Sequence, residues 1–104
     1  MNRRSKIPFV HTREFVKTFP EKPGIYMLVC PTTMAMYIGA TNNLRRRMSQ
    51  HLRAKHSKYL GFNPQILELA DTSDPKILDE LEQKYISIYK PGLNNPKASK
   101  YSAK

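Results

Sequence analysis

The chain of 104 residues contains little cysteine, little glycine and no long apolar run. Its one cysteine, Cys30, excludes a disulfide framework and a cysteine-rich zinc site, and fits a reducing interior. Four glycines exclude both glycine-rich nucleotide-binding fingerprints. Since no run of about 18 apolar residues exists, no membrane-spanning helix is predicted. The apolar run from Ile7 to Val10 is short and is interrupted by Pro8, which excludes a secretion signal.

Acidic residues are scarce in the first part of the chain. Residues 1–61 contain twelve Lys and Arg but only two acids, Glu14 and Glu21, for a net charge of +10, whereas residues 62–104 contain six of each and are neutral. This polarised charge favours a polyanionic partner, because basic side chains bind phosphates and release counterions. Two other interpretations stay open: a basic surface that only confers solubility, and an anionic membrane, for which residues 42–56 are too polar to be a good match.

Length and composition predict one compact domain, because cores of about 100 to 150 residues are the commonest size and 39% of the residues are hydrophobic. No internal repeat is present. Residues 1–8 are expected to form a basic, poorly ordered arm that can touch phosphates. We divide the chain into a basic arm with a short helix over 1–21, a domain over 22–96 and a basic tail over 97–104.

Hydrophobic periodicity and turn residues predict three helices and three strands. Helices are expected over residues 12–19, from a cap at Thr41 or Asn42 to about His56, and from Pro75 to before Pro91, and strands over residues 24–30, 36–40 and 65–70. The first strand is apolar at both odd and even positions, so it is predicted to be central. A hairpin joins it to the second strand and brings Tyr26 near Tyr37.

Side chains that recur at these periods define the expected core. Its members are Leu44, Met48 and Leu52; Ile66, Leu67 and Leu69; and Ile77, Leu78, Leu81, Tyr85, Ile88 and Tyr89. Cys30 is interpreted as a core thiol. His11 and His56 are interpreted as surface residues, because neither has a partner at the spacing of metal ligands.

The predicted helix after residue 42 contains no acidic residue. At 100° per residue, Arg47 and His51 lie one turn apart, beside the expected apolar stripe. A structural surface helix would gain from opposite charges four residues apart, which are missing here. A solvated surface stays the alternative for Arg45 more than for Arg47. We interpret four further basic residues of this segment as nucleic-acid-binding: Arg45, Arg46, Arg53 and Lys55.

A carboxylate, an arginine, a histidine and two tyrosines can together hydrolyse a phosphodiester. The carboxylate can hold Mg²⁺ or Mn²⁺, which polarises the phosphate. Arginine stabilises the growing charge, and a tyrosine or histidine takes a proton from water. Tyrosine has a pKa near 10, which must be lowered before it acts as a base at neutral pH. Glu82, beside the apolar face, is the candidate carboxylate; Glu80 competes, but Lys84 offers it a surface pair.

Five short motifs occur in one order along the chain. They are Gly24-Ile25-Tyr26; Tyr37-Ile38-Gly39, with ten residues between the two tyrosines; Asn43-Leu44 with Arg47 and His51; Glu82 with Tyr85 and Ile86; and Asn94 in Pro91-Gly92-Leu93-Asn94. This pattern resembles the GIY-YIG nuclease family over about residues 22–96. One departure is Ala40, where the repair branch of the family tends to place a lysine, and Arg46 is the candidate to supply that cation.

The resemblance implies an α/β fold class of the α+β type, with a small three-stranded antiparallel β-sheet flanked by helices. It also implies a stand-alone, metal-dependent endonuclease that uses one Mg²⁺ or Mn²⁺ to cut DNA, leaving 5′-phosphate and 3′-hydroxyl ends. The implied roles follow the motifs: Tyr26 is the general base, Tyr37 positions water or phosphate, Arg47 stabilises the transition state, His51 assists the base, Glu82 binds the metal, and Gly24, Gly39 and Asn94 support the site.

Two alternatives to a DNA endonuclease stay open: a nucleic-acid-binding module that has lost the chemistry, and an RNA-directed nuclease. A module without catalysis would be free to lose Glu82 or Arg47, and both are present. Relatives join this domain to others that choose the target, and this chain has no room for one. Specificity is therefore expected from a homodimer, a partner protein, or the structure of duplex or branched DNA. The expected location is the cytoplasm or another compartment containing nucleic acid.

Overall fold

The computed structural model describes residues 11–94; the predicted arm over 1–8 and the tail over 97–104 lie outside them. In chain order the elements are α1 (Arg13–Val16), β1 (Gly24–Val29), β2 (Met36–Thr41), α2 (Leu44–Arg53), β3 (Asn63–Leu69) and α3 (Pro75–Tyr89). The strands form one sheet in the order β2-β1-β3, and β1 pairs antiparallel with both neighbours. The predicted fold class, with β1 as the central strand of a three-stranded antiparallel sheet, is confirmed.

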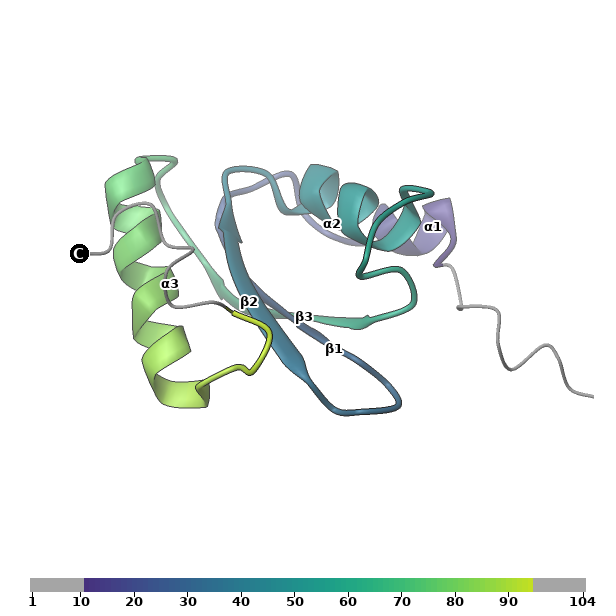
Figure 1. The fold of residues 1–104 in the computed structure, drawn as a ribbon. Helices are drawn as coiled ribbons and strands as arrows, with labels where there is room; N and C mark the ends of the chain where they lie inside the picture. Colours follow the sequence, from purple (N-terminus) through teal and green to yellow (C-terminus); the bar gives the residue numbers. More distant parts are fainter. Residues whose placement is uncertain (1–10, 95–104) are drawn as a thin grey trace, which may run out of the picture.

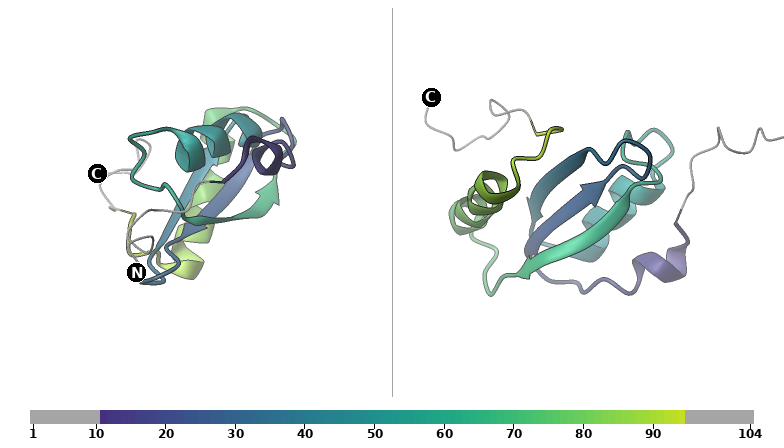
Figure 2. Two further views of the ribbon diagram at one scale, coloured as in Figure 1. Left: turned by 90° about the vertical axis from the view of Figure 1, so that its right-hand side faces the viewer. Right: turned by 90° about the horizontal axis from the view of Figure 1, so that it is seen from below.

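The sheet separates two apolar layers, with α3 on one side and α1 and α2 on the other (Figures 1 and 2). Side chains of β1 alternate between the two layers, so β1 is covered on both faces. Tyr26 and Leu28 pack with the α1 and α2 side chains, while Ile25 and Met27 pack with α3. The side of the sheet that carries Tyr26 is therefore the side that α2 covers.

The helix ends differ from the expected ones. Thr12 caps α1 as predicted, but α1 ends at Val16, because the chain turns before Pro20. Asn43, not Thr41 or Asn42, caps α2: its side chain accepts a hydrogen bond from the backbone N–H of Arg46. The same helix stops at Arg53 rather than near His56. No helix between residues 11 and 94 is long and apolar enough to cross a bilayer.

Four burial predictions were wrong. His11 is buried rather than on the surface, and its ring nitrogen bonds the carbonyl of Phe62 at 3.0 Å. Leu69 is half-exposed, because it is the last residue of the edge strand β3. Cys30 is partly exposed beside the hairpin turn, where its thiol lies 3.4 Å from the Thr32 hydroxyl. The apolar face of α3 is narrower than predicted, because α3 covers a sheet of only three strands, and its outer members are exposed: Ile77, Ile88 and Tyr89.

Candidate active site

Tyr26 and His51 form a hydrogen-bonded pair between β1 and α2. The phenol of Tyr26 is fully buried, and its oxygen lies 2.8 Å from Nε2 of His51. In the neutral tautomer that carries its proton at Nδ1, Nε2 accepts the hydrogen bond and the tyrosine donates it. The pair therefore places the Tyr26 hydroxyl, which can give up its proton, next to Nε2 of His51, which can accept a proton.

Gly39 makes room for the phenol. It lies directly opposite Tyr26 in the β1–β2 register, and a Cβ atom at position 39 would come within 2.5 Å of the ring carbon that bears the hydroxyl. Gly24 is confined in the same way, since a Cβ there would lie 2.6 Å from the carbonyl oxygen of Glu68 and 2.8 Å from Cδ1 of Leu44. Both glycines are thus required by close packing, Gly39 against the Tyr26 phenol and Gly24 against β3 and α2.

We expect Gly39→Ala to displace the Tyr26 phenol and to lower the cleavage rate by about two orders of magnitude, since a misplacement of roughly 1 Å at a reacting centre can have that effect. Gly92→Ala is the matched control, because nothing lies within 4 Å of a Cβ at that exposed position. Single-turnover rates of the two variants, together with their melting temperatures, provide the measurement. Equal rates for Gly39→Ala and Gly92→Ala would show that the position of the phenol is unimportant.

Tyr37 lies on the same side of the sheet, with its ring centroid 6.3 Å from that of Tyr26. Tyr59, which the sequence did not indicate, joins the group: its ring stacks on Tyr37 at 4.8 Å and meets the ring of His51 edge-on at 4.9 Å. Tyr59 follows α2 in a loop without periodicity, so no sequence pattern marked it. Its buried ring fixes the positions of two site residues at once.

Arg47 lies close enough to Tyr26, Tyr37 and His51 for its positive charge to affect the pKa of all three. Its positive charge opposes the rise in the pKa of Tyr26 and Tyr37, and it adds to the fall in the pKa of His51. The Nε atom of Arg47 is buried and has no hydrogen-bond partner among the residues that the structure describes. An unsatisfied buried donor costs about 1 to 3 kcal/mol. The site therefore holds a donor that an anionic oxygen would satisfy.

Burial dominates the protonation of the Tyr26–His51 pair. It raises the pKa of Tyr26 well above its usual range, and the neighbouring Tyr37 adds to the rise. Burial, followed by the charge of Arg47, lowers the pKa of His51 to about 4. At neutral pH both partners are therefore uncharged, and the imidazole is ready to accept a proton.

The low pKa of His51 also predicts how stability changes with pH. Between the ordinary pKa of 6.5 and about 4, an unfolded chain binds a proton at this histidine and the folded chain does not. The free energy of unfolding should therefore fall as the pH drops from 6.5 to about 4. His51→Gln should lose less stability over this interval than the wild type, whereas His56→Gln, at an exposed histidine, should behave like the wild type. Thermal melts across this pH range provide the measurement, and parallel wild-type and His51→Gln curves would contradict the assignment.

Glu82 is half-buried on α3, on the other side of the sheet from α2. Burial is the main cause that raises the pKa of Tyr37, and the charge of Glu82 is the second, so this carboxylate lies within electrostatic reach of Tyr37. Glu80 is exposed, and Lys84 pairs with Glu68 at 3.8 Å rather than with Glu80 as predicted.

Within residues 11–94, no three His, Cys, Asp or Glu side chains gather into a complete metal site. A cation held by Glu82 would keep most of its water ligands, which is how Mg²⁺ commonly binds. A single carboxylate as protein ligand fits a hard, hydrated divalent cation and does not fit zinc.

Asn94 holds the end of the described chain against β2. Its side-chain oxygen accepts from the N–H of Ile38 at 2.8 Å, and its amide nitrogen donates to the carbonyl of the same residue at 2.8 Å. Leu93 adds a backbone bond to Met36 at 2.9 Å. These bonds pair the free edge of β2 next to Tyr37, so Asn94 fixes the backbone of the site.

The other basic residues of α2 lie away from this pair. Arg45 donates from Nε to the carbonyl of Phe19 at 2.8 Å, and Arg53 donates from Nε to the carbonyl of His11 at 3.2 Å. Arg46 donates to the side chain of Asn42 at 2.5 Å, and its role as a substitute for the missing lysine stays a prediction. Lys55 is exposed beyond the end of α2.

Comparison with known proteins agrees with this geometry. A family model described as the GIY-YIG catalytic domain matches residues 22–95. The structure is similar to a crystal structure of the GIY-YIG N-terminal endonuclease domain of UvrC from Thermotoga maritima, bound to its catalytic divalent cation. The TM-score is 0.57 at 19% identity, over 91% of this chain and 99% of that one.

Two sequence relatives are the UvrABC system protein C of Yersinia enterocolitica and that of Bartonella henselae. The first is 26% identical over 87 residues, which cover 80% of this chain and 14% of that protein. The second is 42% identical over 41 residues, which cover 39% of this chain and 6% of that protein. The chain thus corresponds to a small part of these relatives.

Proposed function

The chain belongs to the GIY-YIG catalytic domain family and is an endonuclease domain, and we propose that it hydrolyses DNA phosphodiester bonds with one bound divalent cation. The observation that carries the proposal is the hydrogen-bonded pair of Tyr26 and His51 beside the buried Nε of Arg47. Buried donors in a protein core are nearly always paired, so an unpaired one beside this pair points to a bound group. A phosphate oxygen supplies the missing acceptor for Arg47 and lies next to the pair that moves the proton.

Tyr26 takes the proton of the attacking water while its own hydroxyl proton passes to Nε2 of His51. The pair is arranged for this transfer over 2.8 Å. A buried imidazolium is unfavourable in the protein alone, but the negative charge of a bound substrate favours it. Tyr37, held by Tyr59, positions the water or a phosphate oxygen. Arg47 donates to the oxygens on which negative charge grows.

Glu82 would hold the cation, which would supply the positive charge that polarises the phosphate and stabilises the leaving oxygen. The cation bound to the Thermotoga domain supports a divalent metal in this chain as well. We assign Mg²⁺ or Mn²⁺, because a lone carboxylate with water ligands suits these ions. The products are then a 5′-phosphate and a 3′-hydroxyl, and the catalytic unit comprises residues 22–96.

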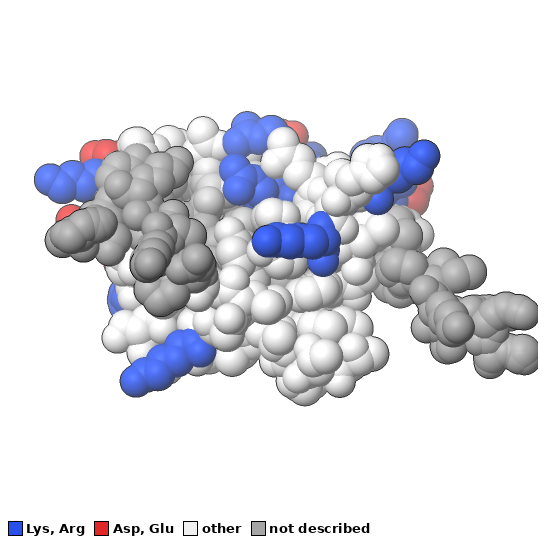
Figure 3. Space-filling model, viewed as in Figure 1, with Lys and Arg blue, Asp and Glu red and all other residues white. Residues whose placement is uncertain are grey.

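The basic surface supports DNA, in duplex or branched form, as the substrate. Lys and Arg side chains gather over α2 and α1, with few Asp or Glu among them (Figure 3). Such a surface binds phosphates without reading sequence. Choice of target therefore belongs to a second copy of this chain, a partner protein or the shape of the DNA.

Nicking of supercoiled plasmid tests the proposal. We expect nicks with Mg²⁺ or Mn²⁺ and none with EDTA, and the nicked ends should be sealed by DNA ligase, because ligase requires a 5′-phosphate beside a 3′-hydroxyl. Metal-independent nicking, or nicks that ligase does not seal, would overturn the assignment. If structured RNA is cut and DNA is left intact, the reaction would be the same but the substrate would be RNA rather than DNA.

A further inference from the structure

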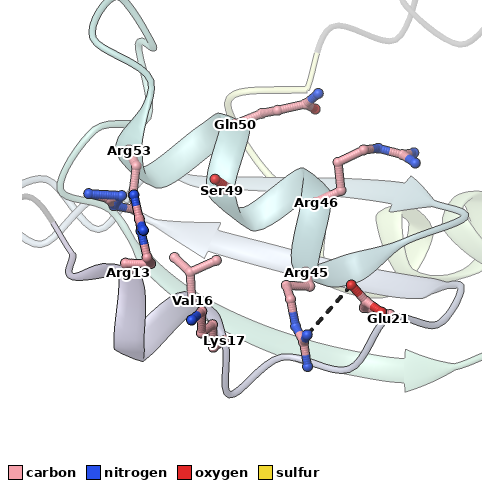
Figure 4. Close-up of a pocket in the computed structure, with 9 residues that line it drawn as sticks. All are labelled: Arg13, Val16, Lys17, Glu21, Arg45, Arg46, Ser49, Gln50 and Arg53. Atoms are coloured by element: carbon pink, nitrogen blue, oxygen red, sulfur yellow. Dashed lines mark ion pairs between the residues drawn. The ribbon is translucent and has the colours of Figure 1, made fainter.

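A groove on the described surface lies apart from the Tyr26–His51 pair. It measures about 400 Å³ and lies between α1 and α2 (Figure 4). Five basic side chains and one carboxylate line it, with Ser49 and Gln50 as polar neighbours. The charged members are Arg13, Lys17, Arg45, Arg46, Arg53 and Glu21. Of these five cations, Arg45 is the one that the structure pairs with a carboxylate within the described residues, at 3.5 Å from Glu21.

The groove and the reacting centre lie on opposite flanks of α2. Arg45, Ser49 and Arg53 recur every four residues along one side, whereas Arg47 and His51 lie on another. At 100° per residue, the centres of these two stripes are about 180° apart around the helix. The width of a helix with its side chains, about 10 to 12 Å, separates them. One phosphate cannot contact both.

Backbone carbonyls from the segment that carries α1 hold two groove arginines in place. Arg45 and Arg53 each use Nε for a bond to this segment, to Phe19 and His11 respectively. A guanidinium has five N–H donors, so four remain on Arg53, whereas Arg45 also directs one terminal nitrogen toward Glu21 at 3.5 Å. Arg13 and Arg53 lie at one end of the groove, and Arg45 lies with Glu21 at the other (Figure 4). Anchoring through Nε thus orients the remaining donors in advance, which lowers the entropy lost when an anion binds.

We propose that this α1–α2 groove binds a second stretch of nucleic-acid backbone, away from the bond that is cut. The occupant is a phosphodiester backbone because five cations and one carboxylate favour a polyanion, and planar guanidinium groups match phosphate oxygens. Four of the nine residues that line the groove come from residues 13–21, which precede the part matched by the family. Since each strand carries a phosphate about every 3.4 Å, the substrate extends at least about three base-pair steps beyond the cut. The inference rests on nucleic acid as the proposed substrate.

The test compares two double variants that each remove two positive charges. Arg13→Ala with Lys17→Ala empties the α1 side of the groove, and Lys76→Ala with Lys84→Ala removes the same charge from the exposed surface of α3. Both are made in the Glu82→Gln background, and binding to a duplex of about 30 base pairs, or three helical turns, is titrated in EDTA at several salt concentrations. This readout does not require cleavage.

We expect the groove variant to bind at least about tenfold more weakly and to reduce the log–log salt slope by close to 2, at about 0.9 for each lost phosphate contact. The α3 variant should match its parent. Bound duplex should also protect Lys17, and not Lys76, from acetylation. Equal losses in both variants, or no loss in the groove variant, would overturn the inference even if the wild type nicks DNA. If the wild type binds DNA through the groove but never cleaves it, the proposed endonuclease activity would be wrong, and the groove would still be a nucleic-acid-binding site.

Discussion

Replacing Glu82 with glutamine is expected to reduce metal-dependent cleavage by at least about three orders of magnitude, because a lost cation removes several kcal/mol of transition-state stabilisation. Glutamine keeps the shape of the side chain and removes its charge. DNA binding should be unchanged or tighter, since a carboxylate without its metal repels phosphates. Single-turnover rates and binding titrations on the same duplex separate the two effects.

Glu80→Gln is the matched control. Glu80 lies two residues earlier on α3 and is exposed, whereas Glu82 is half-buried and acts on Tyr37 through its charge. The Glu80→Gln variant should therefore cleave within a few-fold of the wild-type rate, as is usual for a change at an exposed surface residue. If Glu80→Gln abolished cleavage and Glu82→Gln did not, the cation would lie on the other flank of α3 and the assigned metal ligand would be wrong.

The sheet, the approach of Tyr26 to Tyr37 and the shared flank of Arg47 and His51 could be predicted because they depend on local patterns, whereas the pairing of His51 with Tyr26 was implied only by the family resemblance. A strand that is apolar at every position must be covered on both sides, and β1 is central. Tyr26 and Tyr37 were expected near one another across a hairpin, and the rings lie 6.3 Å apart. Residues four apart on a helix share a flank, which brings Arg47 and His51 to the same side of the sheet as the tyrosines.

What could not be predicted depends on contacts between distant segments. Tyr59 lies in a loop without periodicity, and only its packing on Tyr37 and His51 brings it into the site. His11 is buried because its segment docks against the carbonyl of Phe62, which lies 51 residues away. The groove arises because the segment of α1 packs on α2, and a four-residue helix has too weak a pattern to reveal that docking.

Replacing Arg47 with lysine is expected to lower the single-turnover rate by about two orders of magnitude or more at saturating enzyme, with affinity little changed. Lysine keeps the charge, and loses both the planar fork and the Nε donor. That donor is buried and without a hydrogen-bond partner in the described residues. In the proposed mechanism, a phosphate oxygen of the substrate accepts its hydrogen bond. A group used mainly in the transition state affects the rate rather than the affinity.

Arg45→Lys is the charge-matched comparison on the opposite flank of α2. Arg45 already uses Nε for the carbonyl of Phe19, so its replacement should weaken the hold on the α1 segment and the binding of long duplexes. That loss should shrink at low salt, because exposed charges interact over longer distances when fewer ions screen them. The Arg47→Lys defect should persist at every salt concentration. Equal losses in the two variants, both rescued by low salt, would mean that Arg47 only attracts DNA and that the chain binds nucleic acid without cutting it.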